Sequence, residues 1–458
     1  MLPTPSTNEP DFAAFIAIDW ADREHAWALQ VAGSTRRETG KLAHTPEAIE
    51  AWALAWASRF AGRPVAVALE QSRGALLYAL RKYPHLVLYP IHPSTSHDYR
   101  KAMFPSGCKD DPGDADLLLD LLTLHRHRLR ALHPDTEQTR KLQTLVEKRR
   151  QLVDERTALT NRITGQLKLY FPQVLDWFDE LHTPMVAAFL RRWPTLPRLQ
   201  QEDPAVLRNF FHQHGSRSQQ RIDNRLSQIQ QATPAVEDPA VVDPAVLMVG
   251  ALLDVVAALN GGLRVLEKSI EQVASAHPDY AIFSSFPAAG RTMAPRLLAA
   301  FGSHRERFSS AGEMQTFSGI APVIQASGNQ RWTHFRWACA KFLRQTFQEY
   351  AGLSIPRCGG ARAFYQQQKA KGKSHHAAVR SLAFKWIRIL FHCWQTRQPY
   401  QEQLYQAARE AHRVAIAGKP TRADTTSGGQ TLPNKGGKRQ NSTLKSAGEI
   451  LKSLMAEA

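Results

Sequence analysis

The sequence predicts a multidomain α/β plus α protein, with an α/β domain at its N-terminal end and a mostly helical remainder. Three observations support this fold class. Apolar stretches of strand length alternate with helical patterns in the first 130 residues, which is typical of an α/β domain. Leucines at intervals of seven then indicate a long helix, and a second seam of this kind follows before residue 275. A segment rich in aromatic residues and arginine comes after it.

The same patterns predict the domain boundaries. We expect an α/β domain over 12–130, a helical or coiled-coil region over 131–275 and a mostly helical C-terminal domain over 276–405. Residues 415–458 are polar, basic and rich in Gly, Ser and Thr, so they are expected to be a disordered basic tail.

Charge and cysteine usage narrow the class of protein. The chain has 458 residues, and its 58 Lys and Arg outnumber 41 Asp and Glu, giving a formal net charge of +17. Such an excess attracts polyanions, and nucleic acid is the commonest large one. The four cysteines form no C-x-x-C pair, which argues against a zinc cluster or a disulfide framework and suits a reducing cytosol.

No membrane partner is expected. The first residues, MLPTPSTNEPDF, lack the charged start and apolar stretch of a signal peptide. The most apolar segment, AVLMVGALLDVVAALNGG, is interrupted by Asp254 and Asn260 and is expected to fall short of a membrane-spanning length. We therefore expect a cytoplasmic protein.

The elements of the α/β domain follow from hydrophobic patterning. Residues 12–31 predict a strand, a short turn and a second strand, and residues 45–60 have helical periodicity. Further buried strands are expected over 64–72 and 85–93. The stretch GCKDDPGDADLLLDLL contains the breaker Pro112-Gly113, after which a helix is expected from Asp114.

Four carboxylates of this domain are candidates for a metal site. Asp19 and Glu70 end apolar strands, where burial is costly without a cation or a donor. Adjacent strand ends of an α/β sheet point towards one crevice. Asp111 and Asp114 are three residues apart and share a face if helical. Taken singly, a strand-end carboxylate is more often bonded to backbone amides, but the set favours Mg²⁺.

The helical region is defined by two seams. Leu145, Leu152 and Leu159 lie seven apart, and no proline interrupts the pattern from 135 to Pro172. A 4–3 pattern over 252–273 forms the second seam, which Asn260-Gly261-Gly262 weakens at its middle; its members are Leu252, Val256, Leu259, Leu263, Leu266, Ile270 and Val273. An intramolecular helical hairpin and a dimer interface are both open.

A serine turn is the candidate nucleophile of the C-terminal domain. Ser327-Gly328 follows a short apolar strand, and four cations come after it: Arg331, Arg336, Lys341 and Arg344. A serine so placed can present its oxygen to a phosphate, with cations to stabilise the transition state, although an ordinary turn is the alternative. Trp332, Phe335 and Trp337 are either stacking surfaces or core residues, and the core is the expected place.

Two further segments of this domain contain basic residues that are candidates for nucleic-acid binding or for a helix start. FPAAGRTMAPRLLAAFG places a Pro-x-x-Gly turn before a helix, in the manner of a helix-hairpin-helix element whose amides hold a DNA phosphate, and it includes Arg291. His375-His376 lacks a Cys or His partner at zinc spacing and is interpreted as a basic helix start.

In this order, the motifs resemble the insertion-sequence-110 family of transposases, the bridge-RNA-guided recombinases of mobile elements. IAIDWA supplies Asp19 and VALEQS supplies Glu70 of a D-E-D-D quartet. The K-x-D-x-x-D-A pattern matches Lys109, Asp111, Asp114 and Ala115, and a G-x-x-P…S-G motif matches Gly319, Pro322 and Ser327-Gly328. Pro112-Gly113 departs from the family pattern, which leaves Asp110 and Asp116 as alternatives to Asp111. The resemblance covers about residues 12 to 400.

The resemblance implies a fold and an activity. The first domain would be RuvC-like (RNase H-type), with Asp19, Glu70, Asp111 and Asp114 binding Mg²⁺. Ser327 would form a covalent phosphoserine link to DNA. The residues that would contact nucleic acid are Lys109, Arg291, Arg331, Arg336, Lys341 and Arg344. A structured guide RNA would select donor and target DNA, and the chain would assemble as a homodimer or homotetramer, nucleoid-associated when on DNA.

Two other functions are compatible with the residues. A metal-dependent endonuclease or junction resolvase would use water as its nucleophile and leave Ser327 structural. A non-catalytic nucleic-acid-binding protein would need no carboxylate quartet, and the four carboxylates argue against it.

Overall fold

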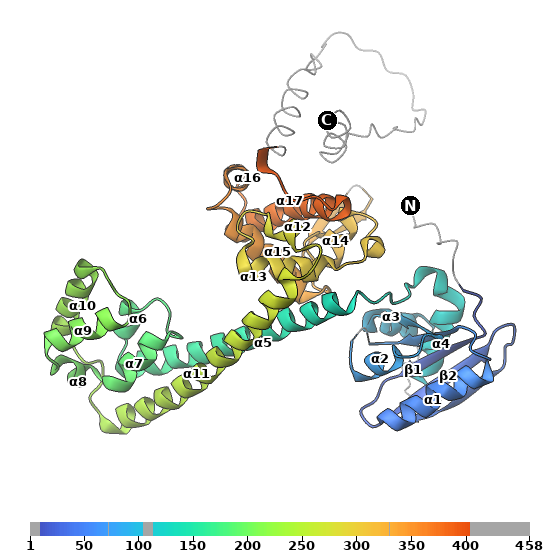
Figure 1. Cartoon of the computed structure of the whole chain (residues 1–458), viewed down its shortest axis with the longest axis horizontal. Coiled ribbons are helices and arrows are strands. Elements are labelled where there is room, and N and C mark those ends of the chain that lie inside the picture. Colours follow the sequence, from blue (N-terminus) through green and yellow to red (C-terminus); the bar gives the residue numbers. More distant parts are fainter. Residues whose placement is uncertain (1–9, 72, 104–112, 329, 404–458) are drawn as a thin grey trace, which may run out of the picture. The chain divides into compact units, whose positions relative to one another are not determined.

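A computed structural model describes residues 10–71, 73–103, 113–328 and 330–403, and the chain forms two units (Figure 1). The first unit ends at Pro134 and the second begins at Asp135. The α/β start and the mostly helical remainder expected from the sequence are confirmed. The finer boundaries at 130, 275 and 405 stay a prediction, and the expected tail at 415–458 lies outside the described residues.

The first unit is built on a five-stranded sheet in the order β3-β2-β1-β4-β5. Strands β2 and β3 follow β1 as an antiparallel meander, whereas β4 and β5 run parallel to β1. The strands are β1 (Ala14–Asp19), β2 (Glu24–Val31), β3 (Arg37–Ala43), β4 (Val65–Leu69) and β5 (Leu86–Pro90). Strand β3 was not expected from the sequence. Parallel β1 and β4 therefore end at the same edge of the sheet.

Helices cover both faces of this sheet. Because successive side chains of a strand point to opposite faces, Ile16 and Ile18 of β1 pack in the core that includes Trp52 of α1, while Ala17 packs in the core that includes Leu118 of α4. The helices are α1 (Pro46–Arg59), α2 (Ala75–Leu80), α3 (Pro93–Met103) and α4 (Asp114–His125), followed by the 3₁₀ turn η1 (Arg126–Arg128). Helix α4 begins at Asp114, as expected.

Two long helices, α5 (Glu137–Tyr170) and α11 (Pro239–Ser275), run antiparallel along each other in the second unit (Figure 1). Arg149 donates to Glu267 at 2.6 Å, and Arg156 donates to the side-chain oxygen of Asn260 at 2.9 Å. The residue numbers of the contacting side chains therefore increase along α5 as they decrease along α11, as expected for antiparallel helices. Helix α11 is continuous through Asn260, whose amide also donates to the His182 carbonyl at 2.8 Å, so the weak point expected there is bridged.

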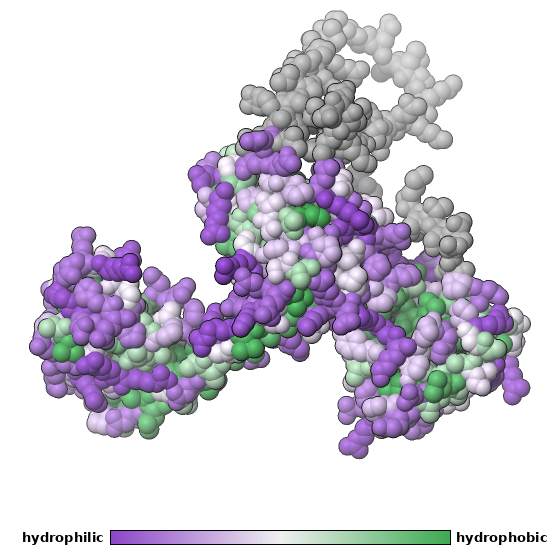
Figure 2. All heavy atoms as spheres, viewed as in Figure 1, coloured by the Kyte–Doolittle hydropathy of each residue, from purple (hydrophilic) through white to green (hydrophobic). Residues whose placement is uncertain are grey.

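The predicted seams of these helices face one another within one chain. Leu142, Leu252 and Leu263 are buried, and Leu152 contacts the position of Gly262. By length and composition α11 also meets the criterion for a membrane-spanning helix, contrary to the sequence expectation; core helices meet it too. Figure 2 shows apolar surface along the paired helices. Leu247 of α11 is exposed.

Shorter helices gather into two cores at opposite ends of the α5–α11 pair. One core contains the end of α5 and the first half of α11, with α6 (Val174–Trp177), α7 (Pro184–Arg192), α8 (Leu196–Gln200), α9 (Pro204–Gln213) and α10 (Gln219–Gln231). The other contains the start of α5 and the end of α11, with α12 (Tyr280–Ser284), α13 (Gly290–Phe301), η2 (Arg305–Arg307), α14 (Ala311–Phe317), α15 (Lys341–Ser354), α16 (Gly359–Ala370) and α17 (His375–Thr396). The hairpin β6 (Val323–Ser327) and β7 (Gln330–His334) projects from this second group.

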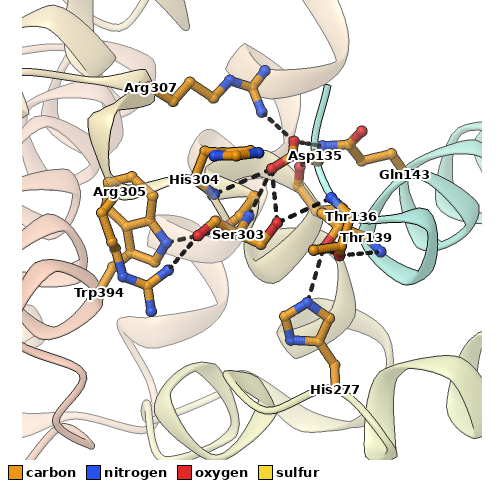
Figure 3. Close-up of polar contacts among 12 residues, drawn as sticks. Asp135, Thr136, Thr139, Gln143, His277, Ser303, His304, Arg305, Arg307 and Trp394 are labelled. Atoms are coloured by element: carbon orange, nitrogen blue, oxygen red, sulfur yellow. Dashed lines mark hydrogen bonds and ion pairs between the residues drawn. The ribbon is translucent and has the colours of Figure 1, made fainter. Parts of the chain in front are cut away.

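Asp135 ties the start of α5 to the loop that follows α13 (Figure 3). Its carboxylate accepts hydrogen bonds from the backbone amides of Ser303 at 2.8 Å and His304 at 3.3 Å. Gln143 donates to it at 3.0 Å, and Arg307 lies 3.3 Å away. Because the Asp135 side chain is only 7% exposed, these donors are needed to compensate its burial.

Candidate functional site

Asp19 and Glu70 lie side by side at one edge of the first unit's sheet. Ile18 of β1 pairs in register with Leu69 of β4, so the residues that follow them occupy neighbouring positions at the strand ends. Parallel neighbours are about 4.8 Å apart. The sheet therefore places Asp19 and Glu70 next to each other, as expected from the sequence.

The negative charge of Asp19 costs free energy in this partly buried position beside Glu70. Partial burial raises the pKa of Asp19, and the nearby Glu70 raises it further, against the opposing effects of Arg100 and the Trp20 backbone amide. The Ser96 hydroxyl donates to the Glu70 carboxylate. Two adjacent carboxylates with incomplete compensation favour a bound cation.

Arg100 of α3 supplies positive charge at this edge. It forms an ion pair with Asp114, the first residue of α4, which is held against the sheet by buried leucines on the same helix. A cavity of about 230 Å³ opens beside these residues, and its lining includes Glu70, Ser96, His97, Arg100 and Asp114. Sequence reasoning did not identify Ser96 or Arg100, because neither belongs to a motif; only the contact between α3 and the strand ends reveals them.

The chemical type of these donors suits a divalent cation, but the described part of the chain does not bring three of them within reach of one ion. Oxygen ligands from Asp19, Glu70 and Asp114 suit Mg²⁺, and the raised pKa of Asp19 reflects a carboxylate that a cation would stabilise. Asp111, Asp110 and Lys109 lie outside the described residues. Within the described ranges no group of three or more His, Cys, Asp or Glu is close enough to hold a metal ion.

The other aspartates of α4 point elsewhere. Asp116 and Asp120 both pair with Arg37 of β3, the former at 3.4 Å. Asp116 is thus engaged in fixing the helix on the edge strand, which leaves it poorly suited as an alternative ligand.

Ser327 lies at the tip of the β6–β7 hairpin in the second unit. It pairs in register with Gln330, and Gly328 between them has a φ of +55°, a conformation that glycine adopts readily. The Ser327 side chain is exposed. The strand preceding it is exposed on both faces rather than buried, so the hairpin presents the serine hydroxyl to solvent.

The base of this hairpin is fixed by its glycine and arginine residues. Gly319 has a φ of +72°, and a Cβ there would lie 2.3 Å from the Cys339 sulfur, so no other residue fits. Arg336 donates to the Ala321 carbonyl at 3.2 Å, and Arg344 donates to the Arg336 carbonyl at 3.0 Å. The motif glycine and the two arginines therefore brace the start of β6.

The remaining predicted cations and aromatic residues take different places. Arg331 lies on β7, where it pairs in register with Ala326 and is exposed, and Lys341 is exposed at the start of α15. Trp332 and Trp337 are 45% and 78% exposed, so their expected place in the core is wrong; among the described residues no second layer covers the hairpin.

The Pro-x-x-Gly segment forms a tight turn between α12 and α13. Ala288 and Gly290 have positive φ values of +65° and +44°, and the turn leads directly into α13. Arg291 is 86% exposed there and lies 3.4 Å from Glu271 of α11. Among the described residues, Arg291 shares no contact with Ser327 or the cations at the base of the hairpin.

Comparison with known proteins matches the segments that contain these residues to transposase families. Residues 16–172 match a family model of IS110 DEDD elements described as a transposase, and residues 280–366 match the model of the transposase IS116/IS110/IS902 family. A Streptomyces coelicolor protein named for the transposase of the IS117 mini-circle is 30% identical over 409 residues, covering 86% of this chain and 97% of that protein.

The chain belongs to the IS110 family of transposases. The 43.6 kDa protein of insertion element IS110 from Streptomyces coelicolor is 27% identical, over 63% of this chain and 71% of its own length. The 42 kDa protein of insertion element IS900 from Mycobacterium paratuberculosis is 24% identical, over 71% of this chain and 81% of its own. The family resemblance drawn from the sequence is confirmed, and membership in this family implies a DNA-processing enzyme.

Proposed function

We propose that this IS110-family transposase cuts and rejoins donor and target DNA by forming a covalent bond between Ser327 and a DNA phosphate. The observation that carries the proposal is the exposed hydroxyl at the tip of a braced hairpin, within a chain that also aligns carboxylates at one sheet edge. A mixed sheet with carboxylates at the ends of neighbouring parallel strands supports a RuvC-like first domain. The paired α5 and α11 support a coiled-coil middle region.

The reaction would exchange phosphodiester bonds without net hydrolysis. The Ser327 oxygen attacks the phosphorus, the bond from phosphorus to one sugar oxygen breaks, and the departing oxygen takes up a proton. The DNA stays attached to Ser327 until the hydroxyl of a new strand attacks the same phosphorus and releases the serine. The phosphoserine link retains the free energy of the broken phosphodiester bond, so the DNA strands can be rejoined.

Asp19, Glu70 and Asp114, with Asp111, are the residues that would hold Mg²⁺ in this transposase. The ion would supply charge stabilisation to a phosphodiester undergoing displacement. Arg100, now paired with Asp114, would be free to move to a DNA phosphate once that carboxylate is engaged. We further propose that a structured guide RNA selects the DNA sequence, that the chain works as a homodimer or homotetramer, and that it resides in the cytoplasm.

The covalent link is the decisive test. The full-length protein is incubated with cognate DNA, guide RNA and Mg²⁺, denatured, and analysed for DNA attached to protein. Ser327→Ala is expected to abolish the attachment, whereas Ser318→Ala, which changes a buried serine of the same domain, is a matched control for loss of a hydroxyl. If Ser327→Ala cleaves DNA at the wild-type rate, water is the nucleophile and the protein is a nuclease.

Metal binding can be tested without activity. Mg²⁺ or Mn²⁺ is expected to raise the melting temperature of the wild-type protein, because a ligand that binds only the folded state stabilises it. Asp19→Asn keeps an acceptor for the Trp20 amide and should lose this rise. Asp22→Asn, in the exposed turn after β1, should keep it. An equal rise in wild type and Asp19→Asn would show that the carboxylate edge is not the metal site.

A further inference from the structure

Two arginines from separate helices converge on one aromatic ring at the base of the serine hairpin. The guanidinium carbons of Arg344 on α15 and Arg380 on α17 lie 4.7 and 4.5 Å from the centre of the Phe335 ring. Arg336, the next residue, has its backbone carbonyl bound by Arg344 at 3.0 Å. Phe335 and these three arginines are here called the arginine cluster; two guanidinium groups, from α15 and α17, meet at one ring, and the Arg336 backbone contacts one of them.

The arginine cluster has no acidic partner within the described part of the chain, where no ion pair involves any of its three members. Partial burial lowers the pKa of Arg380, and the like charge of Arg344 lowers it further. The Nε of Arg380 is buried and makes no hydrogen bond. Like charges brought together, with a donor left unused, cost free energy that an anionic ligand would recover.

Two other part-buried arginines in the second unit form ion pairs with carboxylates. Arg305 pairs with Asp279 at 2.6 Å, and Arg296 pairs with Glu349. Both arginines also lie over an aromatic ring, as the members of the arginine cluster do. Arg305 and Arg296 thus each have a carboxylate partner, whereas Arg380 has none among the described residues.

An exposed aromatic residue adjoins the arginine cluster. The Trp337 ring lies 4.8 Å from the Phe335 ring and is 78% exposed. Exposed aromatic side chains beside cations are a common feature of surfaces that bind the sugars and bases of nucleic acids.

We propose that Arg344 and Arg380 form a clamp for a backbone phosphate of the DNA strand that Ser327 attacks. Val323 pairs with His334 at the hairpin base, and four strand residues at about 3.3 Å each place Ser327 about 13 Å away. That length corresponds to about four phosphates of one strand along the axis of duplex DNA. The clamp deepens the proposed function and depends on it for the identity of the strand.

The planar guanidinium groups suit this ligand. Each guanidinium can donate two parallel N–H bonds to phosphate oxygens, and stacking on Phe335 limits the rotation of both groups before DNA arrives. The clamp reads no base, which agrees with selection of sequence by a guide RNA. Arg380 was not among the cations identified from the sequence, because it lies more than 50 residues beyond Ser327 on α17.

The test measures DNA binding by the full-length, RNA-free protein in EDTA, so that no cleavage occurs. Affinity for a short DNA duplex is followed over a range of salt concentrations. Arg380→Gln is expected to weaken binding and to reduce the slope of log affinity against log salt by about one, as for one lost phosphate contact. Arg344→Gln should act similarly. Arg388→Gln, an exposed arginine on the same helix, should leave slope and affinity unchanged.

The outcomes separate the clamp from the proposed chemistry. A wild-type slope and affinity for Arg380→Gln would overturn the clamp, and so would a larger loss for an RNA duplex than for DNA. Arg380→Lys keeps one charge in the same place and should bind DNA more tightly than Arg380→Gln, which distinguishes a phosphate contact from a folding defect. Ser327→Ala should bind like wild type, so failure of covalent capture would overturn the serine mechanism and leave the clamp standing.

Discussion

His25 is a buried histidine whose protonation state is fixed by its neighbours. Its Nδ1 accepts a hydrogen bond from the Ala21 amide at 3.1 Å, and its Nε2 lies 2.8 Å from Nδ1 of His44. An accepting Nδ1 requires the neutral ring with its hydrogen on Nε2, which then donates to His44. Burial lowers the pKa of His25, and His44 lowers it further.

The first unit is therefore expected to lose stability in mild acid. A free histidine has a pKa of about 6.5, and the folded value lies lower, so below about pH 6.5 the unfolded chain binds more protons than the folded one. Stability that is fully present at neutral pH should fall as the pH drops through this window. His25→Asn should flatten the dependence of the unfolding free energy on pH, and His127→Asn, at an exposed position, should not. An equally steep curve for His25→Asn would contradict the assignment.

At the scale of single residues, the sequence predicted the strand-end carboxylates but not their surroundings. Asp19 and Glu70 follow apolar strands, and the parallel register that brings them together is a consequence of strand order. Arg100 and Ser96 reach the same edge only because α3 packs beside it, and no spacing in the sequence encodes that contact. Asp111 stays a predicted ligand.

At the scale of elements, regular hydrophobic patterns were predictable and exposed strands were not. The spacing of leucines in α5 identified a long helix because a packed seam repeats. Strand β3 has no clear hydrophobic pattern, because only Leu42 of its residues is buried and the strand lies at the sheet edge. The sequence predicted a strand before Ser327 but not the return strand β7, and the core predicted for Trp332 is one that an isolated two-stranded hairpin cannot form.

A substitution at Gly302 tests the contact between the end of α13 and Asp135, which lies just before α5. Its φ is +77°, and a Cβ there would lie 2.6 Å from a carboxylate oxygen of Asp135. Gly302→Ala should cost about 2 kcal/mol or more of unfolding free energy, since the conformation is strained and Asp135 must move from its amide partners. Gly312→Ala, in helix α14 with its nearest neighbour at 3.7 Å, should stabilise by about 0.5–1 kcal/mol. Urea titrations followed by helical circular dichroism measure both, and a neutral Gly302→Ala would show that the Asp135 contacts are weak.

At the scale of the whole molecule, the apolar seams of α5 and α11 were compatible with an intramolecular hairpin or with a dimer interface, and the pairing of the two helices favours the hairpin. The seam side chains meet within one chain, so a dimer cannot use them without first separating the hairpin. Helix α11 nevertheless leaves apolar side chains uncovered: Leu247 is 75% exposed and Val265 is 70% exposed. Their spacing of eighteen residues is about five helical turns, which places them on the same face.

This outer face of α11 is where we expect the oligomer of the transposase to form. Leu247→Glu with Val265→Glu should lower the molecular mass measured by light scattering, since burying two carboxylates in an apolar interface is costly. Leu54→Glu, at an exposed leucine of α1, introduces the same change on the other unit and should leave the mass unchanged. A double variant with the wild-type mass would place the interface elsewhere, and a wild-type protein that stays monomeric at all concentrations with DNA bound would contradict assembly altogether. If the mass falls and covalent capture of DNA falls with it, while the α5–α11 hairpin keeps its melting temperature, then catalysis depends on a second copy of the chain.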